Sequence, residues 1–109
     1  MAIVDMSKNS DVEVEFDFIG VRKHPAHNGY RPAHMVKDDY LTTGVHYYYN
    51  TGEIAGNGKA IGTIKFVTPE VYPNCLWVGK KISIQEGVKI IGPATVRKIF
   101  NPILLDDTR

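Results

Sequence analysis

The sequence has a single cysteine, Cys75, and no apolar run that approaches the ~20 residues of a membrane-spanning helix. One cysteine cannot form an internal disulfide, so nothing in the sequence indicates an oxidising compartment. The first residues, MAIVDMSKNSD, include acidic side chains and lack the long apolar core of a secretion signal. We therefore expect a cytoplasmic protein without a membrane partner.

Strong net charge is also missing. The formal net charge is +1, which argues against non-specific binding of nucleic acid through a strong electrostatic field. Residues 1–54 hold eight acidic and five basic residues, whereas residues 55–109 hold four acidic and eight basic residues. A basic patch on the second half is compatible with this distribution but is not required by it.

Phosphate-binding loops are absent as well. No GxxxxGK[ST] motif occurs, and the spacing of Gly56, Gly58 and Gly62 is not followed by a helix that could present backbone N–H groups. These glycines indicate turns. We expect neither a nucleotide nor another cofactor.

The sequence does contain short alternating runs that are typical of β-strands. In the clearest run, the apolar residues Val12, Val14, Phe16 and Phe18 alternate with acidic residues. This alternation predicts a strand with one buried face and one solvent-exposed face. The acidic side chains on the exposed face would also discourage edge-to-edge pairing with another strand. No amphipathic helix of ten or more residues is evident. Further strand signals, separated by Gly, Pro and Asn turns, cover residues 33–36, 44–49, 61–67, 77–85 and 88–100. The 109 residues thus predict one all-β domain, a sandwich or a barrel.

The stretch Gln85–Phe100, QEGVKIIGPATVRKIF, predicts a hairpin that reverses at Glu86-Gly87. Glycine supplies the positive φ that a tight reversal needs. Gly92-Pro93 interrupts the return strand and predicts a bulge, a bend or an edge position.

This hairpin resembles the closing hairpin of the third domain of translation elongation factor Tu. The GYRP motif at residues 29–32 and the TTGV motif at residues 42–45 are similar to two further segments of that domain, in the same order. The resemblance covers residues 11–100. It implies a small antiparallel, closed or nearly closed six-stranded β-barrel over 11–100, with an N-terminal extension at 1–10 and a C-terminal tail at 101–109.

In that family, the third domain contacts the T-stem of aminoacyl-tRNA and packs against the GTPase domain. The resemblance places Glu86 and Gly87 at T-stem positions, together with Ala33 and His46, where the family has glutamine and threonine. Ala33 cannot form a side-chain hydrogen bond, so half of the tRNA-contacting pattern is lost. Aromatic and basic side chains are common in binding surfaces, and the candidates for binding a partner or RNA are Arg31, His34, His46, Tyr48, Glu86, Gly87 and Lys89.

Three functions are compatible with these observations. The preferred one is a non-catalytic module that binds a protein partner, for example as an immunity or decoy protein. The second is an RNA- or tRNA-binding module that contacts a T-stem-like duplex. The third is a small hydrolase that uses Cys75 or a metal bound by the histidines, although the H-P-A-H sequence at residues 24–27 has no carboxylate or thiolate at a usual ligand spacing. We expect no catalytic residue and no metal.

Overall fold

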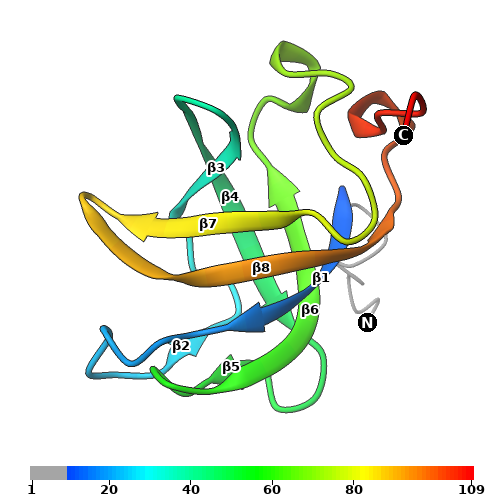
Figure 1. Ribbon diagram of the computed structural model, residues 1–109. Helices are drawn as coiled ribbons and strands as arrows, with labels where there is room; N and C mark the ends of the chain where they lie inside the picture. The colour runs from blue at the N-terminus through cyan, green and yellow to red at the C-terminus, as the bar shows by residue number, and fades with distance from the viewer. Residues whose placement is uncertain (1–9) are drawn as a thin grey trace.

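The computed structural model describes residues 10–109 and contains a closed antiparallel barrel of six strands (Figure 1). Around the barrel the strands follow the order β1-β6-β4-β3-β7-β8. Their bounds are Val12–Asp17 (β1), Ala33–Lys37 (β3), Tyr40–Tyr48 (β4), Lys59–Phe66 (β6), Lys81–Glu86 (β7) and Lys89–Ile99 (β8). The predicted all-β, six-stranded barrel is confirmed. Residues 1–9 of the predicted extension lie outside the described part of the chain.

Four short elements complete the fold. A second sheet pairs β2 (Ala26–His27) with β5 (Glu53–Ile54), and its residues Ala26 and Ile54 belong to the hydrophobic core. None of the strand ranges predicted from the sequence covers β2. Two 3₁₀ turns, η2 (Pro69–Val71) and η3 (Pro102–Leu104), follow β6 and β8. Between residues 10 and 109, no helix has the length and apolarity needed to cross a membrane.

Strand β1 has the alternation that its sequence predicts, but it is not an edge strand. Val12, Val14 and Phe16 are fully buried, and β1 pairs with β6 on one side and with β8 on the other. Glu13 is also buried, because its carboxylate accepts a hydrogen bond from Tyr49 Oη at 2.7 Å and pairs with Arg97 Nε at 3.3 Å. The prediction that the acidic residues of this strand protect an edge is wrong, since a closed barrel has no edge there.

The Gly92-Pro93 pair lies where the barrel bends. The register between β7 and β8 shifts between Ile84 and Gln85, which is the bulge predicted for this part of the return strand. A Cβ atom on Gly92 would lie 2.1 Å from the carbonyl oxygen of Asp17. Glycine is therefore required here because β8 approaches the end of β1 so closely.

The last nine residues form part of the folded structure. Leu104 is fully buried. The Leu76 N–H donates to the Leu104 carbonyl oxygen at 2.9 Å, and the Asp106 N–H donates to the Leu76 carbonyl oxygen at 2.8 Å. Asp11 anchors the start of this segment, because its carboxylate accepts hydrogen bonds from Asn101 Nδ2 at 2.9 Å and from Phe66 N–H at 2.7 Å. The segment predicted as a tail thus packs on the barrel, with η3 beside η2 (Figure 1).

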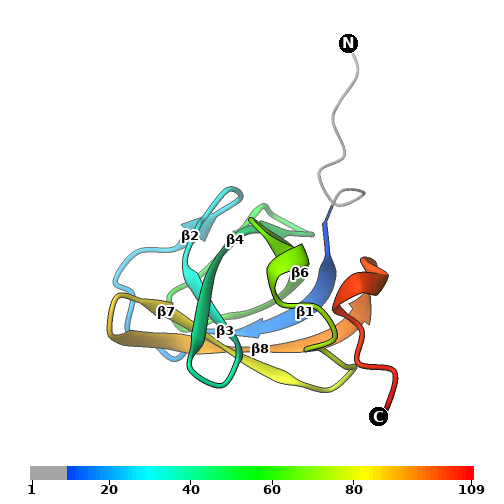
Figure 2. The same ribbon diagram turned by 90° about the horizontal axis from the view of Figure 1, so that it is seen from above.

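The barrel has two distinguishable ends. The β7–β8 turn projects on one side of the molecule, and the C-terminal segment lies on the other, in both views (Figures 1 and 2). The strand pairing gives the same two ends. Val12, at the start of β1, pairs with Ile64 near the end of β6 and with Ile99 at the end of β8, whereas Asp17, at the end of β1, pairs with Lys59 at the start of β6.

Candidate functional site at the hairpin end

The β7–β8 turn has Gly87 and Val88 as its two central residues. Glu86 pairs with Lys89, so Glu86 is the last residue of β7, not part of the reversal predicted from the sequence. Gly87 has a φ of 60°, and glycine at the first central position is the pattern of a type II′ hairpin. The turn exposes Val88 almost completely, at 96%.

Glu86 joins the turn to two other segments of the chain. Its Oε2 atom accepts hydrogen bonds from Arg22 Nη1, in the loop after β1, and from the hydroxyl of Tyr30, in the loop before β3. The Arg22 guanidinium also lies over the Tyr30 ring, 4.5 Å from its centroid. An ion pair, a hydrogen bond and a cation–π contact thus hold three segments in one arrangement.

The electrostatics of this cluster keep Glu86 ionised and Tyr30 protonated. Burial disfavours the Glu86 carboxylate, but hydrogen bonds from Tyr30 and Arg22 outweigh this effect, and the pKa of Glu86 lies below its usual value. Burial and the hydrogen bond to Glu86 both raise the pKa of Tyr30. The hydroxyl of Tyr30 therefore remains a donor throughout the physiological range.

Three further basic residues surround this cluster. Arg31 follows Tyr30, whose hydroxyl donates to Glu86, and Lys89 pairs with Glu86 across the turn. Lys23 and Lys89 line one shallow depression of about 260 Å³ with Glu86. Lys23, Arg31 and Lys89 are exposed and form no ion pair within residues 10–109. Because Arg22 neutralises Glu86, these three cations give the surface a positive charge.

Apolar side chains are exposed between the basic residues. Val88 lies at the tip, Ile90 is 52% exposed, and in the loop after β1 Ile19 and Val21 are 58% and 42% exposed. The backbone N–H of Ile19 donates to Ile91 O at 2.9 Å, which places this loop beside β8. We call the surface formed by residues 19–23, Arg31 and residues 86–90 the hairpin end.

The structure removes three predicted residues from the surface. His34 and His46 are fully buried and Tyr48 is 3% exposed, so none of these side chains can contact a partner. Their strands alternate as expected, and Tyr48 takes the inward position between the half-buried Tyr47 and the exposed Tyr49. The prediction of a binding role is therefore wrong for these three residues. Glu86, Gly87 and Lys89 lie together at the β7–β8 turn, and Arg31 follows Tyr30, whose hydroxyl donates to Glu86.

The buried histidines form a directed hydrogen-bond chain. His34 Nδ1 lies 3.2 Å from Thr42 O, which can only accept, so this nitrogen carries the proton. His34 Nε2 must then accept from His46 Nε2 at 2.7 Å, and His46 Nδ1 accepts from the Tyr48 hydroxyl at 2.9 Å. Burial lowers the pKa of His34 to about 4 and lowers that of His46 well below its usual value. Both imidazoles are neutral, and all four ring nitrogens have partners.

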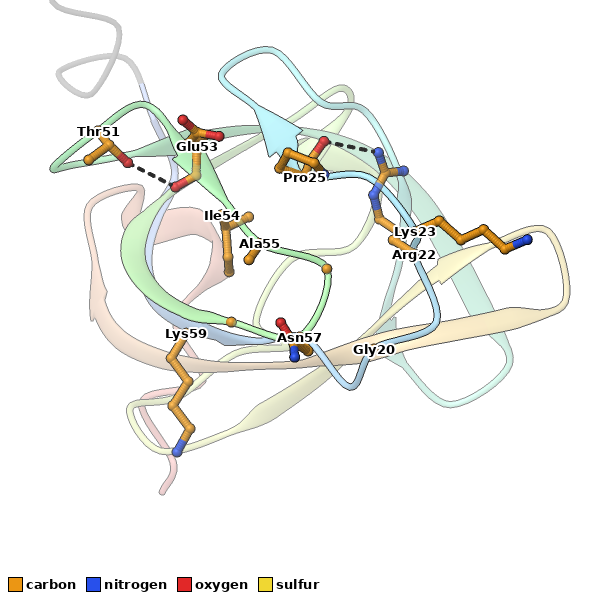
Figure 3. Close-up of a pocket in the computed structure, with 12 residues that line it drawn as sticks. Gly20, Arg22, Lys23, Pro25, Thr51, Glu53, Ile54, Ala55, Asn57 and Lys59 are labelled. Carbon is orange, nitrogen blue, oxygen red and sulfur yellow. Dashed lines mark hydrogen bonds between the residues drawn. The ribbon is translucent and has the colours of Figure 1, made fainter.

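A groove of about 700 Å³ adjoins the hairpin end, between residues 20–25 and residues 51–59 (Figure 3). Hydrogen bonds from Arg22 Nη2 to Pro25 O (3.4 Å) and from Thr51 Oγ1 to Glu53 O (3.3 Å) support its walls. The side chains of Lys23 and Lys59 extend outward in different directions, and the Glu53 carboxylate points away from Arg22. The ionisable groups do not converge on one point, as an acid–base pair would.

The Cys75 thiol is buried, and the charged groups that act on it are Lys80 and Lys37. Burial raises the pKa of its thiol, and the buried histidines have no ring nitrogen left to accept its proton. Across residues 10–109, no three His, Cys, Asp or Glu side chains lie close enough together to hold a metal ion. No protein-family model matches the sequence, and no curated protein matches it significantly.

Sequence reasoning missed the parts of this surface that depend on distant contacts. The roles of Arg22 and Tyr30 follow from hydrogen bonds to Glu86 across 64 and 56 residues, which no local pattern reveals. Val88 was detectable, since an apolar residue inside a two-residue turn cannot be buried by its own hairpin. Ile19 and Val21 resemble core residues in the sequence and are exposed only because Gly20, with a φ of 89°, redirects the chain between them.

Proposed function

We propose that this protein is a non-catalytic binding module that engages a protein partner through the hairpin end. The observation that carries this proposal is the exposure of Ile19 and Val21 on the loop after β1 and of Val88 and Ile90 on the β7–β8 hairpin, two segments that the Ile19–Ile91 hydrogen bond and the Arg22–Glu86 ion pair hold together. Grouped exposed apolar side chains on a small domain mark interaction sites more often than single ones do. Such a surface fits an apolar groove that is bordered by carboxylates.

Rigidity supports this assignment. The Arg22–Glu86–Tyr30 cluster fixes the turn against two loops before any partner arrives. A surface that is already ordered loses less conformational entropy on binding. The cluster thus acts as a support, and the contacts are made by Val88, Ile90 and the basic residues.

The resemblance to the third domain of elongation factor Tu fits the same proposal. The segment that carries the resemblance is the β7–β8 hairpin, and it presents the proposed contact surface. We propose that the barrel is of the elongation factor Tu third-domain type, and that its partner is a protein that also recognises that factor. A decoy or immunity protein would act in this way.

RNA is the second candidate, and one observation favours it. Lys23, Arg31 and Lys89 have no ion-pair partner within residues 10–109 and are available to phosphates. Against it, the Glu86 carboxylate, which the resemblance assigns to the T-stem contact, is directed toward Arg22 and Tyr30. Ala33 also lacks the polar side chain found there in the family.

Affinity purification from the native cell tests the two candidates, with the wild type compared with Val88→Asp. As a control, Val67→Asp places the same charge on an exposed valine after β6, away from the hairpin end. We expect a protein that is captured by the wild type and by Val67→Asp and is lost with Val88→Asp. Equal capture by all three baits would refute the hairpin end as the contact surface.

Salt dependence then separates protein from RNA. RNA affinity falls steeply with salt, by roughly one power of the salt concentration for each phosphate contact. We expect the purified complex to lose less than about tenfold in affinity between 50 and 200 mM salt. A nuclease-sensitive complex with a steep salt slope would instead establish the RNA-binding alternative.

A further inference from the structure

A cleft of about 470 Å³ lies at the opposite end of β7 from the turn. Its walls are the end of β3, the segment over residues 73–77 and the start of β7. The hairpin-end surface does not include any of these residues. Both the single cysteine and the single tryptophan of the chain, Cys75 and Trp77, line this cleft.

The cleft holds a positioned ammonium group. Lys80 Nζ donates hydrogen bonds to Val36 O at 2.5 Å and to Cys75 O at 2.7 Å. An ammonium has three N–H donors, and the third has no hydrogen-bond acceptor within residues 10–109. The two carbonyls fix the position of the charge, and no oxygen or nitrogen of residues 10–109 accepts the third N–H, although the Trp77 ring centroid lies 4.5 Å from Nζ.

The charge around this ammonium is positive. Lys37 and Lys81 line the same cleft with Lys80, and Asp38 is the one carboxylate among the lining residues. Three positive charges against one negative charge leave a net charge of +2 on the lining. Lys37 and Lys81 form no ion pair within the described chain, so their charges are not neutralised locally.

An aromatic wall lies beside this charge. Trp77 and Met35 line the cleft, and the Trp77 ring centroid lies 4.5 Å from Lys80 Nζ and 3.5 Å from the Arg109 guanidinium carbon. The turns on either side hold Asp39 and Asn74 at positive φ values of 59° and 57°, which Asp and Asn tolerate better than other side chains. These turns set the shape of the walls before a ligand binds.

We propose that this cleft binds a small organic anion. A carboxylate or phosphate group accepts a hydrogen bond from Lys80 Nζ and is attracted by Lys37 and Lys81, while the apolar body packs on Met35 and beside Trp77, whose ring also contacts the Lys80 and Arg109 cations. A charge-assisted hydrogen bond from a positioned donor gives both affinity and orientation. The inference is independent of the hairpin end, because it involves none of the same side chains.

Tryptophan fluorescence tests this proposal directly, because Trp77 is the only tryptophan. The probes are phenyl phosphate and benzoate, with benzyl alcohol as an uncharged compound of similar shape. We expect a saturable change with the two anions and none with the alcohol at equal concentration. An equal response to all three compounds, or no saturable response, would overturn the proposal.

Lysine variants identify the group responsible. We expect Lys80→Met to weaken anion binding about tenfold or more, which corresponds to the loss of a charge-assisted hydrogen bond. Lys98→Ala, on an exposed position of β8, removes one charge elsewhere and serves as the matched control. If circular dichroism shows that Lys80→Met does not fold, the Lys37→Ala/Lys81→Ala double variant decides: a loss of about tenfold supports the proposal, and unchanged affinity refutes it.

Discussion

Two neutral histidines, His34 and His46, are fully buried in the core of the barrel. Their hydrogen-bond chain has a fixed direction, because Thr42 O can only accept and Tyr48 must donate at the other end. Phe16 and Phe66 pack against the imidazoles, with ring centroids 4.4 Å from His46 and 5.6 Å from His34. Such a network stabilises the core only when each member is satisfied.

Tyr48→Phe tests whether this chain stabilises the fold. The substitution keeps the ring but leaves His46 Nδ1 as a buried acceptor without a donor, and we expect a loss of about 1–3 kcal/mol in the free energy of unfolding. Tyr47→Phe, on the half-buried outer face, is the control and should change stability by less than about 0.5 kcal/mol. Urea denaturation measures the free energy of unfolding of both variants. Equal losses in the two variants would contradict a stabilising hydrogen bond from Tyr48 to His46.

Acidification should destabilise the protein through the same pair. The folded-state pKa of each histidine lies below its unfolded value of 6.5, so their contribution is present above pH 6.5 and is lost as the pH falls toward about 4. Between pH 7 and pH 5 we expect a loss on the order of 2 kcal/mol for each buried histidine. Denaturation curves at the two pH values check this, and a stability that does not change would show that the imidazoles are not buried neutral.

At the residue scale, the sequence distinguished the apolar inner positions of β1 from its outer positions, but it did not show which polar residues of the barrel are buried. His34 and His46 alternate in phase with buried positions, yet a histidine looks like a surface residue until its partners are known. Those partners, Thr42 and Tyr48, are themselves unremarkable in the sequence. The hydrogen-bond chain could not be predicted, because it depends on the register of β3 against β4.

At the scale of elements, the glycines of β8 and its turn serve two different purposes. Gly92 lies against the backbone of Asp17 and Phe18, where β8 meets the end of β1. Gly87 has no atom within 4 Å of the Cβ that it lacks, but it has a φ of 60°. Glycine is required at position 92 because a side chain would clash with the neighbouring backbone, and at position 87 because the backbone has a positive φ.

Replacing each glycine by alanine should separate these causes. Gly92→Ala places a methyl group against a carbonyl of the neighbouring strand, and we expect a loss of about 3 kcal/mol or failure to fold. Gly87→Ala, without a clash, should cost about 1 kcal/mol from the left-handed backbone alone. Thermal unfolding measures the two, and a Gly87→Ala variant that is the less stable of the pair would contradict this account.

The C-terminal segment offers a second test at this scale. Leu104 is fully buried, whereas its neighbour Leu105 is 38% exposed. We expect Leu104→Ala to reduce the free energy of unfolding by about 2–5 kcal/mol and Leu105→Ala by much less. Similar small effects would show that the segment does not belong to the folded domain.

The strands of this barrel were largely predictable, because alternation and turn residues are local. β1, β3, β6 and β8 lie close to their predicted ranges, whereas β4 begins at Tyr40 and not at Gly44, and β7 begins at Lys81 and not at Trp77. The early start of β4 was missed because the chain reverses within Asp38 and Asp39, with Asp39 at a positive φ. Tyr40 therefore already pairs with Lys37 of β3. β2 and β5 were missed because two-residue strands exist only through their pairing with each other.

At the scale of the whole molecule, the barrel core supports two separate surfaces. The core and the histidine chain hold the strands, the hairpin end presents apolar and basic groups on one side, and the lysine-lined cleft lies at the other end of β7. We propose that the first surface binds a protein and the second a small anion. Loss of either function should leave the other intact.

The most direct test of the central proposal is photo-crosslinking in the native cell, with a photoreactive amino acid in place of Val88. The same amino acid in place of Val67 marks the other end of the barrel as a control. The account predicts that position 88 crosslinks to a specific protein and that position 67 does not. Crosslinks from position 88 to RNA, or the same products from both positions, would contradict it.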